Sequence, residues 1–392
     1  MALLGELKGA FAKAGQFAAT RHDVLPPGAS EALAALRDRV PPLPFALVRD
    51  VVEEELGRPI DQAFVSFDRE PIGAASIAQV HRAQLPDGAE VVVKVQYPWI
   101  RDSLENDLLV LSAAAHLWVW LRGHERWGVD RGRFFDEFAS GLREELDFVR
   151  EGAVAAEIAS NLAADPQVVV PRVVAELTRT RVLTMGWHDC VNIADRAGLA
   201  ALGVEPAVVL EVLTRAYAKQ VFVDGHFHAD PHSGNLFVLD EPGAAERPRV
   251  LFVDFGLSKA LDPELRRAIR QGIYAVLQRD TSTFVARMRE MGMIAPGAEN
   301  GVRRAVDEMF GRIAGQAGEG GVLGASGAQV LALKDAAKHL LQETPGLQLP
   351  NELLLYAKTL SYLFALGEEL DPETDLMKIS TPYLLQFLAG RD

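Results

Sequence analysis

Two short stretches of the sequence place oxygen-bearing side chains in a pattern that phosphate chemistry uses. The first is His-Ala-Asp-Pro-His-Ser-Gly-Asn at residues 228–235, with Asp230 and Asn235 five positions apart, and the second is Asp-Phe-Gly at residues 254–256, after an apolar run. In phosphoryl-transfer enzymes an Asp of this kind orients or deprotonates the attacking hydroxyl, and an Asn and a second Asp hold Mg²⁺ against the nucleotide phosphates. Magnesium is a hard cation that takes oxygen ligands. We therefore expect Asp230 to act on the nucleophile and Asn235 and Asp254 to bind Mg²⁺, the alternative being two unrelated polar turns.

A single lysine interrupts an apolar, β-branched run at residues 90–96, which reads Glu-Val-Val-Val-Lys-Val-Gln. The turn Pro86-Asp87-Gly88 before it predicts a hairpin. A lysine in a buried strand is costly unless it is paired, and in kinases such a lysine reaches the α- and β-phosphates and a helix glutamate. We expect this role for Lys94; an edge strand with Lys94 in water is the alternative.

Most residues before that hairpin are small: the stretch reads Gly73, Ala74, Ala75, Ser76, Ile77 and Ala78, and only Ile77 is large. Small residues suit a loop whose backbone passes close to a ligand. The stretch does not contain Gly-x-Gly-x-x-Gly, so neither a standard glycine loop nor a dinucleotide-binding fingerprint is present.

The elements that must position these groups follow from apolar periodicity and from Gly and Pro breaks. We expect helices over residues 1–22, 31–39, 45–56, 100–122, 133–162, 207–224, 331–342 and 353–366, strands over 168–170 and 182–185, and a glycine-rich loop over 311–327. In the helix predicted over 133–162, Asp147 and Glu151 share a face and Glu145 is rotated away from them. A solvated acidic face is the usual meaning of such a run, and pairing with Lys94 requires one carboxylate to turn inward.

Composition narrows the class of protein. The chain has 392 residues, of which 49% are hydrophobic and 24% charged, and its net charge is −14. This acidity argues against nucleic acid as a partner. The sequence also shows no cluster of Lys and Arg residues that would favour docking on anionic lipid. The single cysteine, Cys190, allows no internal disulfide and indicates a reducing compartment. The longest apolar run, residues 108–121, is shorter than the roughly 20 residues that a spanning helix needs. We expect a cytoplasmic protein without a transmembrane segment, with peripheral membrane contact left open.

Taken together, the sequence resembles the UbiB/ADCK (AarF-like) atypical kinase family over nearly its full length. The resemblance is carried by Lys-Ala-Gly-Gln at residues 13–16, Ala-Ala-Ser-Ile-Ala-Gln-Val-His at 74–81, Val-Lys-Val-Gln at 93–96, Glu-Leu-Asp-Phe at 145–148 with Glu151, and the two polar stretches described above. It differs from the family pattern at Ala14 and Ser233, and Gly73 and Ala78 exchange the usual Ala and Gly.

The resemblance implies an α+β fold of the protein kinase-like, bilobal type. Residues 1–60 would form a helical extension packed over the active site, residues 61–186 a small mixed N-lobe with an antiparallel sheet and inserted helices, and residues 187–392 a mainly helical C-lobe with the catalytic and Mg²⁺-binding loops.

The resemblance also implies roles for individual residues. Lys94 would contact the nucleotide phosphates and pair with Glu151, with Glu145 or Asp147 as rivals. The loop at residues 74–78 would cover the nucleotide, and Met185 and Trp187 would border its adenine in the hinge. Lys13 and Gln16 would fold over the site near Glu145 and Asp147 and cover the place where a protein substrate would dock.

The implied function is an ATPase of kinase type that binds ATP or ADP with Mg²⁺ and supports quinone, isoprenoid or other lipid or small-molecule metabolism. One alternative is a small-molecule phosphotransferase of the aminoglycoside/choline kinase type, which shares the Asp and Asn spacing but lacks the Lys-x-Gly-Gln segment and the alanine loop. Another is a non-catalytic nucleotide-binding scaffold. We expect His228 and His232 to be structural, because Cys190 is remote and no third soft metal ligand stands near them.

Overall fold

The computed structural model describes residues 42–122, 131–316, 340, 344, 346–347 and 349–390. The chain divides into two compact units, each described by itself below. The first contains residues 1–160, 169–189 and 252–257, and the second contains residues 161–168, 190–251 and 258–392. The helices predicted over 1–22 and 31–39, together with Lys13 and Gln16, lie outside the described residues, as does most of the helix predicted over 331–342.

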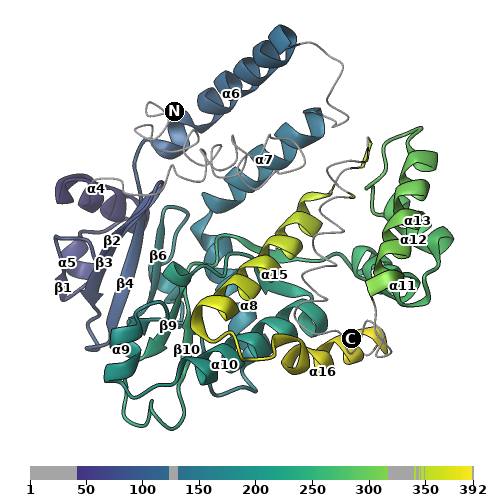
Figure 1. Ribbon diagram of the computed structural model, residues 1–392. Helices are drawn as coiled ribbons and strands as arrows, with labels where there is room; N and C mark the ends of the chain where they lie inside the picture. The colour runs from purple at the N-terminus through teal and green to yellow at the C-terminus, as the bar shows by residue number, and fades with distance from the viewer. Residues whose placement is uncertain are drawn as a thin grey trace. The chain divides into compact units, whose positions relative to one another are not determined.

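The first unit is built on an antiparallel sheet with strand order β1-β3-β4-β6, to which β2 adds on β3. The strands are β1 (Ser66–Phe67), β2 (Gly73–Ala74), β3 (Ala78–Gln84), β4 (Glu90–Gln96) and β6 (Val182–Gly186). Strands β3 and β4 form the hairpin that the Pro-Asp-Gly turn predicts. Helices α4 (Phe45–Leu56) and α5 (Ile60–Ala63) lie beside the sheet (Figure 1) and share an apolar core with β4 that includes Val52, Val91 and Val93.

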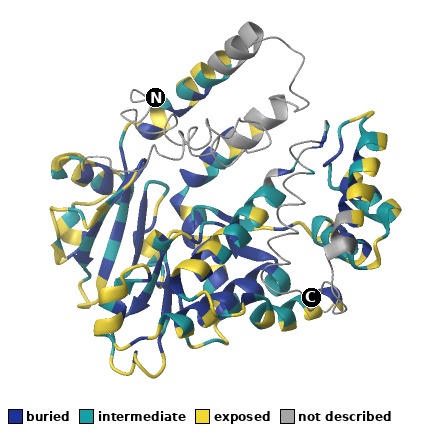
Figure 2. Cartoon of the chain, in the orientation of Figure 1, coloured by how far each residue is buried: buried dark blue, intermediate teal, exposed yellow. Residues whose placement is uncertain are grey.

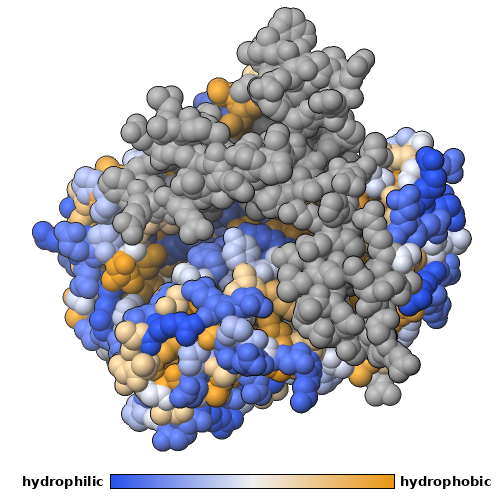
Figure 3. All heavy atoms as spheres, viewed as in Figure 1, coloured by the Kyte–Doolittle hydropathy of each residue, from blue (hydrophilic) through white to orange (hydrophobic). Residues whose placement is uncertain are grey.

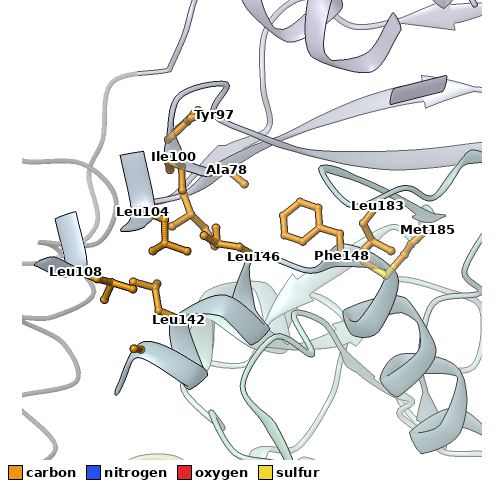
Figure 4. Close-up of a cluster of buried hydrophobic side chains, with 12 residues drawn as sticks. Ala78, Tyr97, Ile100, Leu104, Leu108, Leu142, Leu146, Phe148, Leu183 and Met185 are labelled. Carbon is orange, nitrogen blue, oxygen red and sulfur yellow. The ribbon is translucent and has the colours of Figure 1, made fainter. Parts of the chain in front are cut away.

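A second core of the same unit joins the sheet to three helices, α6 (Ile100–Arg122), α7 (Arg131–Glu145) and α8 (Phe148–Leu162). Figure 4 shows side chains of α6 and α7 meeting at Leu104, Leu108 and Leu142, and Phe148 of α8 beside Leu183 of β6. The short helix η2 (Ala175–Leu177) precedes β6.

The prediction of a single helix over residues 133–162 was wrong, because one helix ends at Glu145 and the next begins at Phe148. The side chain of Asp147 accepts hydrogen bonds from the backbone N–H groups of Val149 and Arg150, at 3.1 and 3.2 Å. Aspartate in this position satisfies N–H groups that have no partner within the helix, and so favours a helix start over a helix interior. Periodicity alone does not separate two helices that follow each other at almost the same phase.

The second unit contains a sheet of strand order β5-β10-β9-β7 and a two-stranded ribbon of β8 and β11. Its strands are β5 (Val168–Val169), β7 (Cys190–Asn192), β8 (His226–His228), β9 (Leu236–Leu239), β10 (Val250–Phe252) and β11 (Ser258–Ala260). Its helices are α9 (Arg196–Ala201), α10 (Pro206–Ala218), α11 (Pro263–Gln278), α12 (Thr281–Glu290), α13 (Glu299–Gln316), α15 (Asn351–Leu370) and α16 (Leu376–Leu388). A π-helix, η3 (Lys219–Asp224), continues α10, and η4 (Ser233–Asn235) is a short 3₁₀ helix.

Helix α10 is the centre of the second unit. It is buried on most of its surface, and both α15 and α16 pack against it; Figure 2 shows the dark blue of buried residues around it and along the neighbouring strands. Helices α11 to α13 pack around a separate core that includes Met288, Val302 and Val306, while their outward face is mostly hydrophilic (Figure 3). The glycine-rich loop predicted from residue 311 was wrong at its start, because α13 continues to Gln316 and a helix interior tolerates isolated glycines.

The α+β class with antiparallel sheets and a mainly helical second unit confirms the predicted fold class. Within the described ranges, none of the helices combines the length and the apolar character that crossing a bilayer requires.

Candidate active site

Lys94, Glu151 and Asp254 form a charge cluster within the first unit. The Lys94 Nζ donates to both carboxylate oxygens of Glu151, at 2.8 and 3.0 Å, and to Oδ1 of Asp254 at 3.2 Å. The three residues come from β4, from α8 and from the Asp-Phe-Gly segment, which are distant in sequence. One ammonium therefore bridges two carboxylates in this unit.

The strand alternation explains why Lys94 faces this way. Val91, Val93 and Val95 point into the apolar core, so the residues between them point to the other face of β4, where they are only half-buried. The ring of Phe148, at the start of α8, lies 4.9 Å from the Lys94 Nζ and supports it by a cation–π contact. Lys94 is thus held between a rigid strand and a buried ring, and the edge-strand alternative does not hold, because β4 pairs with both β3 and β6.

A glycine brings Glu151 within reach of Lys94. Gly152 in α8 lies so close to the sheet that a Cβ there would stand 3.2 Å from Leu183 and 3.2 Å from Val173. Without a side chain at this position, the start of α8 approaches β6 so closely that an added Cβ would require a shift of a few tenths of an ångström. Glu151 is the adjacent residue, and its side chain is only 2% exposed.

The electrostatics of the cluster follow from burial and from an excess of negative charge. Burial raises the pKa of Glu151 to about 7, and the neighbouring anions Asp254 and Glu145 add to this rise, although Lys94 opposes it. Burial alone would lower the pKa of Lys94, but the charges of Asp254 and Glu151 outweigh it and raise the pKa above its usual range. Lys94 therefore remains cationic at neutral pH.

Asp254 adopts a backbone conformation that is rare for residues other than glycine, with a φ of 61°. Its Oδ1 also accepts a hydrogen bond from the Gly256 N–H at 3.4 Å, and half of its side chain is exposed. A strained residue of this kind persists only where the surrounding structure holds it, and such residues concentrate at functional sites. In this conformation the Asp254 carboxylate contacts Lys94 and remains half exposed.

The small residues at 73–78 form a tight turn of β2 onto β3 rather than an open loop. The N–H of Ala75 donates to the carbonyl of Ala78 at 2.8 Å, and the buried Tyr97 hydroxyl donates to the carbonyl of Ala75 at 2.9 Å. Ser76 and Ile77 are buried, and Ile77 belongs to the apolar core shared with α6, α7 and α8. Any ligand contact of this turn must therefore come from its backbone and from Ala74 and Ala75.

Met185 in β6 and Trp187 just after it were expected to border an adenine. Met185 is buried in the apolar core with Leu183. The backbone N–H of Trp187 donates to the Glu90 carbonyl at 3.0 Å. The guanidinium carbon of Arg82 lies over the Trp187 ring, 4.6 Å from its centroid.

Asp230, His232 and Asn235 form a second cluster, within the second unit. The Asp230 Oδ1 lies 2.9 Å from the Nζ of Lys358 on α15, and its Oδ2 lies 3.3 Å from the Nε2 of His232. Burial alone would raise the pKa of Asp230, but the hydrogen bond from His232 and the charge of Lys358 hold it well below its usual range. Asp230 is therefore an anion throughout the physiological range.

Buried polar side chains fix the strand that leads to Asp230. The side-chain oxygen of Gln220 accepts the His228 N–H at 3.0 Å, and the Tyr217 hydroxyl lies 3.1 Å from the His228 Nδ1. Tyr217, Gln220 and His228 are all buried. These contacts hold His228 in the interior of the second unit.

The side chain of Asn235 is fixed through its amide nitrogen. Its Nδ2 donates to the backbone carbonyl of Asp230 at 3.1 Å. Because a carbonyl only accepts, this contact assigns the amide nitrogen and leaves Oδ1 as the other end of the side chain. An amide oxygen is a donor of the type that Mg²⁺ takes, and so is the half-exposed carboxylate of Asp254 in the first unit; their joint use is taken up below as a proposal. Among the described residues, no group of three or more His, Cys, Asp or Glu side chains is arranged to hold a metal ion.

Sequence reasoning missed Lys358. It stands 128 positions after Asp230 in a helix whose apolar periodicity indicates a core element. A lysine among the apolar residues of α15 was the available signal, the same one that marked Lys94 in β4. The predicted regulatory residues Glu145 and Asp147 lie at the break between α7 and α8, where Glu145 is buried and Asp147 caps α8.

Comparison with known proteins places these clusters in context. Residues 35–288 match the family model of the ABC1 atypical kinase-like domain. A protein of Marinobacter nauticus named "Probable protein kinase UbiB" is 32% identical over 99% of this chain and 69% of its own length. The Arabidopsis thaliana protein ACTIVITY OF BC1 COMPLEX KINASE 8, chloroplastic, is 33% identical over 97% of this chain and 53% of its own length.

The solved structure of the Rv3197–erythromycin complex from Mycobacterium tuberculosis has a similar fold. It matches 98% of this chain and 93% of its own, with a TM-score of 0.53 and 24% identity. The chain spans about half to two thirds of the length of the curated relatives that it matches.

Proposed function

The chain belongs to the ABC1 atypical kinase-like family, and from this premise we propose that it binds and hydrolyses Mg-ATP. The observation that supports the proposal most strongly is the cluster of Lys94, Glu151 and Asp254, in which a strand ammonium is held by a helix carboxylate and by the aspartate of Asp-Phe-Gly. In kinases these are the groups that must be in place together for nucleotide chemistry.

Each group has a proposed task. Lys94 contacts the α- and β-phosphates, and Glu151 keeps its ammonium in the direction of the phosphates. Asp254 and the amide oxygen of Asn235 ligate Mg²⁺. Asp230 orients the attacking oxygen. Bound Mg²⁺ neutralises charge on the phosphate oxygens, and the protein contributes chiefly position and preorganised charge.

The attacking oxygen is water in this proposal. Phosphoryl transfer of the loose type needs little help from a strong base, and Asp230, which Lys358 and His232 hold in its anionic form, is a weak base. Orientation and charge are therefore what Asp230 supplies.

Beyond ATP turnover, we propose that the activity serves quinone, isoprenoid or other lipid metabolism. The support is the resemblance to the family. On the same ground we propose that Met185 and Trp187 contact the adenine, and that Lys13 and Gln16 cover a protein-substrate site. They predict that an isoprenoid lipid in detergent changes the rate of ATP hydrolysis, whereas added proteins are not phosphorylated.

The test is phosphate release from ATP with and without Mg²⁺, by the wild-type chain and by Asp254→Asn. We expect the variant to lose at least 100-fold in kcat/KM for Mg-ATP, because it loses the charged metal ligand. Asp240→Asn is the matched control, since Asp240 is an exposed aspartate that follows strand β9 directly.

Equal hydrolysis by the wild type and Asp254→Asn would refute the proposal. Transfer of labelled γ-phosphate to a small hydroxyl compound, in place of phosphate release, would favour a small-molecule phosphotransferase instead.

A further inference from the structure

The two carboxylate oxygens of Asp230 are each held by a donor. Lys358 donates to Oδ1 at 2.9 Å. The N–H of Gly234 donates to the Nδ1 of His232 at 2.9 Å, so this ring nitrogen carries no proton and the other, Nε2, donates to Oδ2 of Asp230. The Asn235 amide also donates a hydrogen bond to the backbone carbonyl of Asp230, so the Asp230 residue has little freedom to rotate.

Lys358 is placed by the packing of α15 and not by a mobile surface. Leu355 and Tyr356 pack on an apolar cluster that includes Phe227 and Ala229, next to Asp230 in sequence. The Tyr356 ring meets Phe227 edge to face, with ring centroids 6.0 Å apart. Thr359, which directly follows Lys358, is fully buried, and its hydroxyl donates a hydrogen bond to the Leu355 carbonyl. These contacts fix the rotation of α15, and hence the direction of Lys358.

Stability alone is a poor reason for this ion pair. The side chains of Lys358 and Asp230 are 19% and 18% exposed, so both charges have lost most of their water. Ion pairs of this kind repay little more than their desolvation cost, and apolar residues of similar volume often stabilise a fold equally well. Ordering a lysine costs side-chain entropy in addition. The arrangement favours a role in which the direction of a carboxylate matters.

We propose that Lys358 is a positioning residue for Asp230. It holds Oδ1 from one side while His232 holds Oδ2 from the other, so that the remaining lone pairs of the carboxylate point in one direction, toward the attacking oxygen. This inference rests on the proposed function, in which Asp230 orients the nucleophile. It adds a residue from α15 to the two polar stretches that carry the chemistry.

The experiment compares Lys358→Met and Lys358→Arg in Mg-ATP hydrolysis. A misplacement of about 1 Å costs about 100-fold in rate, so we expect Lys358→Met to lower kcat by about 10- to 100-fold while KM for ATP and the affinity for ADP change less than about threefold. Lys358→Arg keeps the charge and should restore most of kcat. The control is Lys259→Met, because Lys259 pairs with Glu352 on the same helix at 3.5 Å and with similar exposure.

A double-mutant cycle separates positioning from an independent effect. If Lys358 acts through Asp230, adding Lys358→Met to Asp230→Asn should not lower kcat further. Full multiplication of the two losses would overturn the inference, as would a wild-type kcat in Lys358→Met. Lys358→Gln, which keeps a donor without the charge, replaces Lys358→Met if that variant does not fold, and the same outcomes apply.

The failure of this inference is distinguishable from that of the proposed function. Wild-type hydrolysis that Asp254→Asn abolishes and Lys358→Met leaves intact would overturn only the role of Lys358. A wild-type chain without Mg-dependent hydrolysis would overturn both.

Discussion

A methyl group added at Gly152 tests why Glu151 reaches Lys94. The Cβ of Gly152→Ala would stand 3.2 Å from the Leu183 Cδ1, 3.2 Å from the Val173 Cγ1 and 3.7 Å from Thr178. The first two distances are tighter than ordinary carbon contacts of about 3.5–4.0 Å. Either α8 or β6 must therefore shift by a few tenths of an ångström.

The expected free energy combines two opposing terms. Replacing Gly by Ala inside a helix stabilises it by about 0.5–1 kcal/mol. Overpacking a core costs about 1–3 kcal/mol. We therefore expect Gly152→Ala to leave the free energy of unfolding unchanged or to lower it by up to about 2 kcal/mol. Gly141 in α7 is the matched control, because a Cβ there meets nothing within 4 Å, so Gly141→Ala should stabilise the protein by about 0.5–1 kcal/mol.

Denaturant unfolding of the wild type and the two alanine variants measures this difference, which should be about 1–3 kcal/mol between the variants. The displaced α8 should also loosen the contact of Glu151 with Lys94, so kcat/KM for Mg-ATP should fall several-fold in Gly152→Ala only. Equal stabilisation by the two substitutions would refute the close approach of α8 to β6.

Three further outcomes are expected. Asp147→Ala removes the cap of α8 and should lower the free energy of unfolding by about 0.5–2 kcal/mol in denaturant titrations; no loss would contradict the cap. Burial lowers the pKa of His81, so its contribution to stability is complete above the unfolded pKa of about 6.5 and is lost as the pH falls below it. Between about pH 7.5 and 5, the melting temperature should therefore fall more steeply with decreasing pH for the wild type than for His81→Asn. Parallel curves of melting temperature against pH would exclude the effect. Glu151→Gln leaves Lys94 with one charged partner and should lower kcat/KM for Mg-ATP about 10- to 100-fold, measured against Glu157→Gln at an exposed position of the same helix; equal rates in both variants would contradict the pairing.

Local signals identified most of the regular structure near the candidate site. The alternation of Val91, Val93 and Val95 around Lys94 predicts a strand with the lysine on the opposite face, and the structure confirms the strand and its hairpin. Helices over 45–56 and 100–122 were predicted with the bounds that α4 and α6 have. In each case the pattern that defines the element lies within about twenty residues of sequence.

Errors arose where a local pattern fits two arrangements. Helices α7 and α8 follow each other with similar apolar phase, so the pattern does not reveal that Asp147 starts a new helix. The glycines at the end of α13 favour a loop by propensity, but the helix continues to Gln316, because isolated glycines weaken a helix without ending it.

The sequence by itself determined which residue types could do the chemistry: a lysine in a strand, two aspartates and an asparagine at a spacing typical of phosphate sites. Only the tertiary structure decided their partners. Lys94 contacts Glu151 across 57 positions, and Asp230 contacts Lys358 across 128. Glu145, Asp147 and Glu151 look alike in sequence, yet the break before Phe148 and the missing side chain of Gly152 bring only Glu151 to the ammonium. Such pairings depend on how closely separate elements pack, a property of surfaces in contact that no single stretch of chain contains.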